Sequence, residues 1–87
     1  MQPILNSSRT EKAIRNEINQ TSKRINRLCE EIDSLRAECY WYRHRGEICN
    51  LEEAKYRIEY RVGKLMKAIN RRNKLGRELT EKIHKAG

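Results

Sequence analysis

Hydrophobic positions in the first half of the chain recur at alternating steps of four and three residues. Spacing of this kind places a row along one side of an α-helix, as in a coiled coil. Ser8 and Glu11 have the spacing of a capping box, which marks a helix start. We therefore predict a helix over residues 8–44, after an N-terminal tail of residues 1–7. The row consists of Ile14, Ile18, Thr21, Ile25, Leu28, Ile32, Leu35, Cys39 and Tyr42.

After Tyr42 the row ends, and it resumes in a new register. Continuing the old register would place Gly46 and Glu53 inside. Gly46 suits the left-handed conformation that ends many helices, and Asn50 is a candidate N-cap with an acid three residues on. We predict a turn over residues 45–49 and a second helix over 50–86. The second row consists of Leu51, Lys55, Ile58, Val62, Leu65, Ile69, Arg72, Gly76, Leu79 and Ile83.

Two helices of equal length joined by a short turn are typical of an antiparallel hairpin. The predicted fold is therefore an all-α, antiparallel two-helix hairpin of the coiled-coil type, forming a single domain over residues 8–87. One continuous helix in a parallel dimer, with a stutter at the break, is the competing interpretation. The narrow seam buries little for a chain of 87 residues, so we expect two hairpins to form a four-helix bundle. Apolar residues off the seam that are available for this second contact are Tyr40, Trp41, Met66, Ala68 and Leu75.

Positive charge is distributed unevenly along the chain. The formal net charge is +8, and residues 60–77 contain seven Lys or Arg residues and no acid. Bases at three- and four-residue steps fall on one stripe of a helix, where like charges repel each other unless a counter-charge arrives. We therefore expect this stripe to contact a polyanion. Its candidate binding residues are Arg57, Tyr60, Arg61, Lys64, Lys67, Arg71, Arg72 and Lys74.

Nucleic acid is the polyanion that the stripe favours. A straight row of cations suits contacts with a phosphate backbone, and it lacks the several exposed rings on which single strands stack. Duplex RNA recognised by its shape is therefore the expected partner, in a sequestering or silencing-suppressor type of role. The chain has no zinc-finger spacing and no helix-turn-helix, and its basic block overlaps the heptads instead of preceding them as in a basic-region zipper.

Two other functions are compatible with the pattern. A structural coiled-coil module could use its basic face to dock an acidic protein. Binding to a membrane surface is less favoured, because the basic face lacks the bulky apolar residues that interfacial helices use.

The predicted shape is similar to that of small RNA-binding helical hairpins that dimerise into four-helix bundles. Rop-type plasmid regulators and some viral silencing suppressors that bind duplex RNA are examples. The similarity is one of shape and covers no sequence motif, so it implies a fold and suggests a function only by analogy.

Few residues in the chain indicate other chemistry. Cys39, His44 and Cys49 match no standard zinc spacing, and a fourth ligand is missing. An odd number of cysteines without a signal peptide indicates reduced thiols in the cytoplasm or nucleus, and no apolar run is long enough to span a membrane. We expect a non-enzymatic, intracellular protein with no metal, cofactor or small-molecule substrate.

Overall fold

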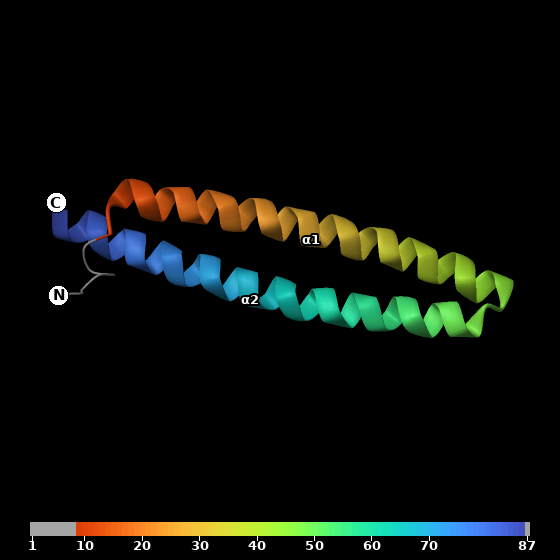
Figure 1. Cartoon of the computed structure of the whole chain (residues 1–87). Helices are drawn as coiled ribbons and strands as arrows, with labels where there is room; N and C mark the ends of the chain where they lie inside the picture. Colours follow the sequence, from red (N-terminus) through yellow and green to blue (C-terminus); the bar gives the residue numbers. More distant parts are fainter. Residues whose placement is uncertain (1–8, 87) are drawn as a thin grey trace.

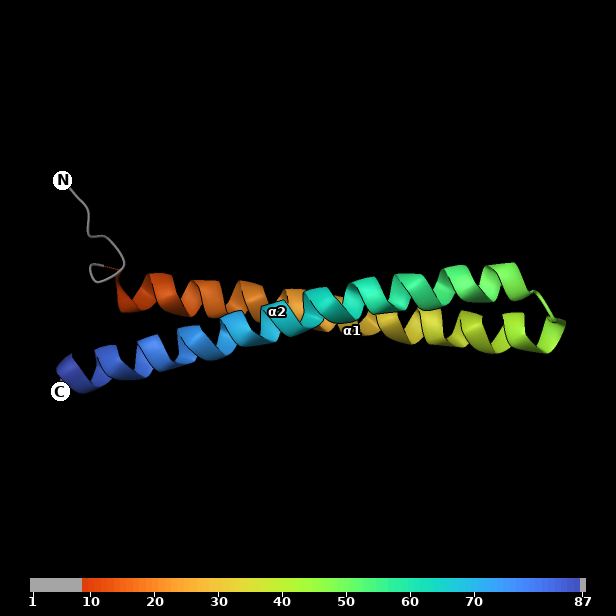
Figure 2. The same ribbon diagram turned by 90° about the horizontal axis from the view of Figure 1, so that it is seen from below.

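The computed structural model describes residues 9–86, with side chains through residue 85. The described chain forms two antiparallel helices, α1 (Glu11–Arg45) and α2 (Ile48–Ala86), which lie side by side with the start of α1 next to the end of α2 (Figure 1). Seen from below, they cross at a shallow angle (Figure 2). The molecule measures 60 × 26 × 14 Å, whereas one continuous helix would extend roughly 110 Å. The hairpin prediction is therefore confirmed, and the continuous rod is excluded.

Helix α1 begins three residues later than predicted. Thr10 has extended backbone angles (φ −78°, ψ 156°) and forms the N-cap. Its hydroxyl oxygen accepts a hydrogen bond of 3.0 Å from the Ala13 amide, which satisfies one of the free N–H groups at the helix start. Ser8, the predicted cap, and the tail of residues 1–7 lie outside the described residues.

Gly46 ends α1, as the sequence predicts. Its backbone is left-handed, with φ 73° and ψ 22°, a conformation that glycine adopts without the steric penalty of a Cβ. The Gly46 amide donates to the Arg43 carbonyl at 3.2 Å, and the Glu47 amide donates to the Tyr42 carbonyl at 2.9 Å. These paired bonds define a Schellman motif, which satisfies the last carbonyls of α1 and reverses the chain.

The turn is shorter than the predicted segment of residues 45–49. The Leu51 amide donates to the Glu47 carbonyl at 3.0 Å, so α2 already begins at Ile48. Asn50 is therefore inside the helix and not at its N-cap. Its side-chain amide instead donates to a Glu47 carboxylate oxygen at 2.7 Å.

The hydrophobic row of α1 packs as predicted against α2. The polar member of the row, Thr21, donates its hydroxyl hydrogen to the Glu17 carbonyl at 2.8 Å, so it does not leave an unsatisfied group in the seam. Ile18, Thr21, Ile32 and Tyr42 are half-buried. The buried members of the row are Ile14, Ile25, Leu28, Leu35 and Cys39.

The predicted register of α2 is wrong at Lys55, Val62 and Ile83, which are exposed, whereas Ile69 and Gly76 are half-buried. Val62 is 37% exposed and Ile83 is 44% exposed, whereas Ala68 and Leu75, which were expected off the seam, are only 7% and 0% exposed. Arg61 replaces Val62 in the seam and is half-buried, because its aliphatic stem can lie along the seam while its guanidinium reaches outward. The observed seam of α2 contains Leu51, Ala54, Ile58, Arg61, Leu65, Ala68, Arg72 and Leu75.

This shift changes which side of α2 the partner helix covers. The apolar surface of α2 is wider than the seam, and α1 packs on only one edge of it. Val62 and Met66, the latter 61% exposed, are left at the surface.

Candidate nucleic-acid interface

Seven of the eight predicted binding residues lie on the same side of the hairpin. Tyr60, Arg61, Lys64 and Arg71 line one groove between the helices. Lys67 lines an adjoining hollow, and Arg57 lines a second one nearer the turn. By helical spacing, Lys74 continues this side beyond Arg71. The eighth residue does not share it.

Arg72 lies on the other side of the hairpin. Its half-buried side chain occupies a seam position and lines a hollow together with Ile18 and Gly76. The structure therefore separates Arg72 from the neighbouring Arg71, because adjacent residues on a helix point about 100° apart.

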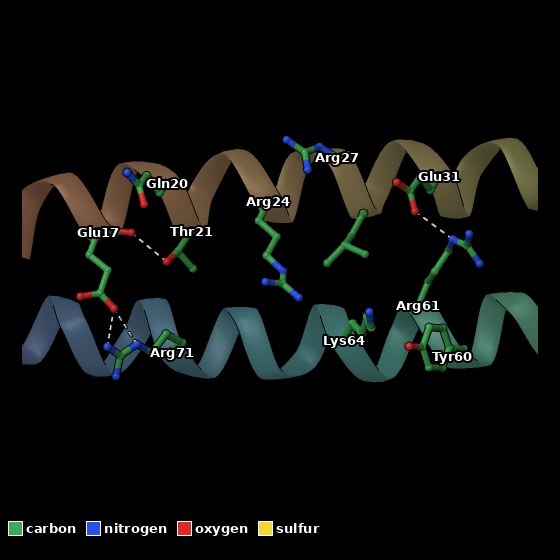
Figure 3. A pocket seen from close by; sticks show the side chains of 11 residues that line it. Glu17, Gln20, Thr21, Arg24, Arg27, Glu31, Tyr60, Arg61, Lys64 and Arg71 are labelled. Carbon is green, nitrogen blue, oxygen red and sulfur yellow. Dashed lines mark hydrogen bonds and ion pairs between the residues drawn. The ribbon is translucent and has the colours of Figure 1, made fainter.

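Two ion pairs cross between α1 and α2 in the described part of the chain. Arg61 Nε donates to Glu31 Oε1 at 2.8 Å. Arg71 Nε donates to Glu17 Oε2 at 3.0 Å, and Arg71 Nη2 contacts the same oxygen. Figure 3 shows both pairs bridging the helices. The hydrogen bond from Arg71 holds the pKa of Glu17 below its ordinary value of 4.5, and the positive charges of Arg71 and Arg9 act in the same direction, against partial burial.

Arg9 extends the Glu17 pair toward the open end of the hairpin. Its guanidinium contacts Glu17 and also lies 3.7 Å from a carboxylate oxygen of Glu78 on α2. This contact ties the segment before α1 to the last turns of α2, where the apolar seam is ending. The ion pairs of the open end are therefore structural, and they occupy Arg71.

Between the two interhelix ion pairs lies a groove with an excess of positive charge. Its volume is about 650 Å³. Figure 3 shows Arg24 reaching from α1 toward α2 in the space between the pairs. Five bases and two acids line the groove, an excess of three positive charges. These charged residues are Glu17, Arg24, Arg27, Glu31, Arg61, Lys64 and Arg71.

The adjoining hollow is lined by bases without any acid. It has a volume of about 350 Å³, and its charged residues are Arg24, Lys64, Lys67 and Arg71. Within residues 9–85, Arg24, Lys64 and Lys67 have no carboxylate within ion-pair distance. Three cations from two helices thus converge with no internal counter-charge.

Toward the turn the charge becomes balanced. The hollow that contains Arg57 is lined by three bases and three acids, the acids being Glu30, Glu31 and Glu38. Arg57 itself pairs with Glu53 at 2.8 Å. The surface around the predicted row of cations therefore carries an excess of positive charge only from Arg61 onward. Arg57 lies where bases and acids balance.

Tyr60 lies against a cation. The ammonium nitrogen of Lys64 is 4.8 Å from the centre of the Tyr60 ring, a distance at which the ring face attracts the charge. The ring is 58% exposed, but the lysine covers one of its faces. The phenol oxygen therefore remains the group best placed to contact a ligand.

Arg24 and Arg27 of α1 belong to the groove, although sequence reasoning did not select them. Residues 18–29 of α1 contain Lys23, Arg24 and Arg27 and no acid, a run that is shorter and less basic than the one in α2. An antiparallel register counted from Gly46 would have placed Arg24 opposite Lys67 and Ala68. The short acid-free run of α1, combined with this register, would therefore have identified the two arginines.

The three cysteines lie in different environments. Cys39 is buried against Leu51 and Ala54, whereas Cys29 and Cys49 are exposed. His44 stacks edge-on against the Tyr40 ring, with 4.3 Å between the ring centres. In the described residues no three His, Cys, Asp or Glu side chains are grouped as a metal site.

Neither α1 nor α2, over the residues described, has an apolar stretch long enough to cross a membrane. Comparison with protein-family models, curated proteins and solved structures finds no match for this chain.

Proposed function

We propose that this protein is a non-enzymatic, nucleic-acid-binding helical hairpin that contacts the phosphate backbone of duplex RNA. The observation that carries the proposal is the convergence of Arg24, Lys64 and Lys67 between the two interhelix ion pairs. Uncompensated like charges at close range destabilise a fold. A bound polyanion supplies the missing counter-charge and releases its own counterions.

The ion pairs prepare the groove for this role. Glu17 and Glu31 neutralise one arginine at each end and hold α1 and α2 in register. The bases between them are thereby fixed on two rigid helices. Preorganised cations lose less conformational entropy on binding than mobile ones do. A short basic groove can therefore contribute more binding free energy than its net charge alone would supply.

A duplex fits this surface better than a single strand. Single strands are held largely by stacking on exposed aromatic rings, and the only aromatic residue lining the described groove is Tyr60, with Lys64 over its face. From Arg61 to Lys74 the basic side of α2 extends about 20 Å at 1.5 Å per residue. A straight surface of this length can follow adjacent phosphates of a duplex, as shape-based recognition of RNA requires.

The functional form in this proposal is a homodimer that forms a four-helix bundle. In support of it, the hairpin buries a single narrow seam in which, among residues 9–85, only Ile14 and Leu75 are completely covered. Small chains with so little core are usually stabilised by a further association.

The test is binding of fluorescently labelled duplex RNA, duplex DNA and single-stranded RNA to two double variants. Arg24→Glu with Lys64→Glu reverses two groove bases and should reduce affinity for duplex RNA by at least about 100-fold, given two lost and reversed phosphate contacts. Arg61 is left intact because it holds Glu31. The matched control, Lys23→Glu with Arg77→Glu, changes the net charge equally at exposed positions outside the groove.

Equal losses in both variants would mean that only net charge matters and that the groove is not the site. Unchanged binding by the groove variant would contradict the proposal outright. Circular dichroism of both variants checks that the helices persist.

Docking of an acidic protein is the second candidate. It is favoured by the balanced charge near Arg57. A surface with both signs of charge suits ion pairs with a protein partner better than contact with the uniformly negative backbone of a nucleic acid. If no nucleic acid binds at low salt, the basic groove and the exposed apolar residues point to a scaffold of this kind.

A further inference from the structure

Helix α2 contains a glycine in its interior that the hairpin itself does not require. Gly63 lies far from both ends of α2, where glycine weakens a helix relative to alanine. A Cβ at this position would meet no atom within 4 Å, so no close packing inside the hairpin explains the missing side chain. Among the described glycines only Gly46 has a positive φ, so Gly63 is not needed for its backbone angles either. The residue therefore leaves an open gap on the surface of α2.

This gap uncovers part of the main chain. A side chain on a helix covers the turn that precedes its own Cα, so its absence at Gly63 leaves the carbonyl oxygens of Glu59 and Tyr60 open to solvent. Each of these oxygens accepts one hydrogen bond within the helix and keeps a second lone pair. Among residues 9–85 no side chain donates to either of them. We call Gly63 together with these two carbonyl oxygens the notch.

The notch lies at the edge of the basic surface. Gly63 follows Tyr60 by three residues and precedes Lys67 by four, so it lies between these two side chains on the helix. Tyr60 lines the basic groove, and Lys67 lines the adjoining hollow. Lys64 and Lys67 have no carboxylate within ion-pair distance in the described part of the chain. A phosphate chain that neutralises these lysines would run beside the notch.

The charges around the notch favour an anion on its lysine side. Glu59 is the nearest acid along α2, and by helical position it lies on the opposite side of Gly63 from Lys67. Toward Lys67 there is no further acid, because residues 60–77 contain none. The acids of α1 that line the groove, Glu17 and Glu31, are already held in the interhelix ion pairs. The notch thus combines two hydrogen-bond acceptors with unpaired cations beside them.

We infer that the notch receives the sugar edge of an RNA strand, with a ribose 2′-hydroxyl donating a hydrogen bond to the uncovered carbonyl oxygen of Glu59 or Tyr60. Phosphate oxygens cannot fill this role, because they and the carbonyl oxygens all accept. In an RNA duplex the 2′-hydroxyl is the donor displayed beside the backbone, in a wide and shallow minor groove, and DNA lacks it. A second copy of this chain fits less well, since it would bring its own lysines against Lys64 and Lys67.

This inference rests on the proposed function and adds to it the means by which the hairpin distinguishes RNA from DNA. It also gives a reason for a glycine that costs helix stability. A side chain at position 63 would cover the acceptors and hold the sugar away from the helix.

Alanine at position 63 closes the notch and provides the first test. Gly63→Ala should strengthen α2 and yet lower the affinity for duplex RNA by about five- to tenfold, the value of roughly one lost hydrogen bond. Its affinity for duplex DNA should not change. Gly76→Ala is the matched control, because a Cβ at Gly76 also meets no atom within 4 Å and this residue lies on the other side of the hairpin, beside Ile18 and Arg72. The control should bind both duplexes as the wild type does.

Normal binding of RNA by Gly63→Ala, or an equal loss of affinity for RNA and DNA, overturns the inference. Sedimentation equilibrium of the same variant tests the alternative of a protein contact. If Gly63→Ala changes the oligomeric state, the gap belongs to a contact between copies and not to RNA.

The complementary change is made in the ligand. A duplex in which fluorine replaces the 2′-hydroxyl groups keeps the A-form shape and the phosphate charge but loses the donor. The wild type should bind it about five- to tenfold more weakly than RNA, whereas Gly63→Ala should bind both equally, because the hydrogen bond is already lost. Losses that multiply as if independent would show that the hydroxyl and the notch do not meet, and would refute the inference.

These outcomes are separate from the test of the proposed function. Arg24→Glu with Lys64→Glu reports whether the groove holds phosphate. If that variant loses binding while Gly63→Ala keeps the full preference for RNA over DNA, the proposed function stands and the assignment of the notch is wrong. If the wild type binds no duplex at low salt, both proposals fail.

Discussion

Salt dependence of duplex binding measures how many bases of the groove contact phosphate. Each phosphate that a protein cation neutralises releases a counterion, so the logarithm of the association constant falls linearly with the logarithm of salt concentration. The structure predicts which bases contribute. Those already held by carboxylates of the protein must break an ion pair first, and they should contribute little.

Five bases on the groove side have no carboxylate partner within residues 9–85. These are Arg24, Arg27, Lys64, Lys67 and Lys74. At about 0.9 per neutralised phosphate, the value for duplex DNA, five contacts give a slope near −4.5, or roughly a 500-fold loss of affinity between about 50 and 200 mM salt. The seven bases selected from sequence would give a slope near −6.3 and a loss of roughly 6,000-fold.

Fluorescence anisotropy with a labelled duplex over a series of salt concentrations measures this slope. A matched variant, Glu31→Gln, frees Arg61 from its ion pair and should steepen the slope by about 0.9 while raising affinity at low salt. A wild-type slope of −6 or steeper, unchanged by Glu31→Gln, would show that the interhelix pairs do not restrain these arginines. A slope near zero would show that the protein makes no phosphate contacts.

Three further predictions concern stability, each measured by urea unfolding at fixed protein concentration with far-ultraviolet circular dichroism. Leu75→Ala, at a completely buried position, should lower the free energy of unfolding by about 3 kcal/mol. Ile83→Ala should lower it by less than about 1 kcal/mol. A larger loss for Ile83→Ala than for Leu75→Ala would support the register predicted from sequence and contradict the observed one. Gly63→Ala, where a Cβ meets no atom within 4 Å, should stabilise α2 by about 0.5–1 kcal/mol, while Gly46→Ala, at φ 73°, should destabilise by about 1 kcal/mol or more; equal effects would contradict the left-handed turn. Because the pKa of Glu17 is lowered by its hydrogen bond from Arg71, its stabilisation is present above the unfolded-state pKa and is lost as pH falls through the folded-state value. The stability difference between wild type and Glu17→Gln should therefore be constant above about pH 5 and shrink as the pH falls below the unfolded-state pKa, and a difference that grows in acid would refute this account.

The fold could be predicted largely from local patterns. The row of α1 is apolar at nearly every seam position, so only one register buries it. Gly46 is the one residue between the rows that adopts a left-handed turn without strain. In α2 the pattern is ambiguous, because Val62 and Ile69 are more hydrophobic than Arg61 and Ala68. Hydrophobicity alone selects Val62 and Ile69 for the seam, whereas the structure places Arg61 and Ala68 there.

The basic stripe was only partly predictable for a related reason. An acid-free run identifies where cations gather along the chain, but counter-charges come from the other helix. Glu17 and Glu31 are 54 and 30 residues away from the arginines that they neutralise. Arg24 joins the groove from the same distant segment, and no pattern within α2 reports it.

The sequence by itself determined two long helices, the reversal at Gly46 and a strongly basic second half, because helix periodicity, glycine's left-handed freedom and net charge are local properties. Tertiary structure decided which edge of α2 is covered, which arginines are neutralised and which cations meet in one groove. Those outcomes depend on how two helices align across space, and the alignment is set by the packing of small residues such as Ala54 and Ala68 and by ion pairs between distant segments.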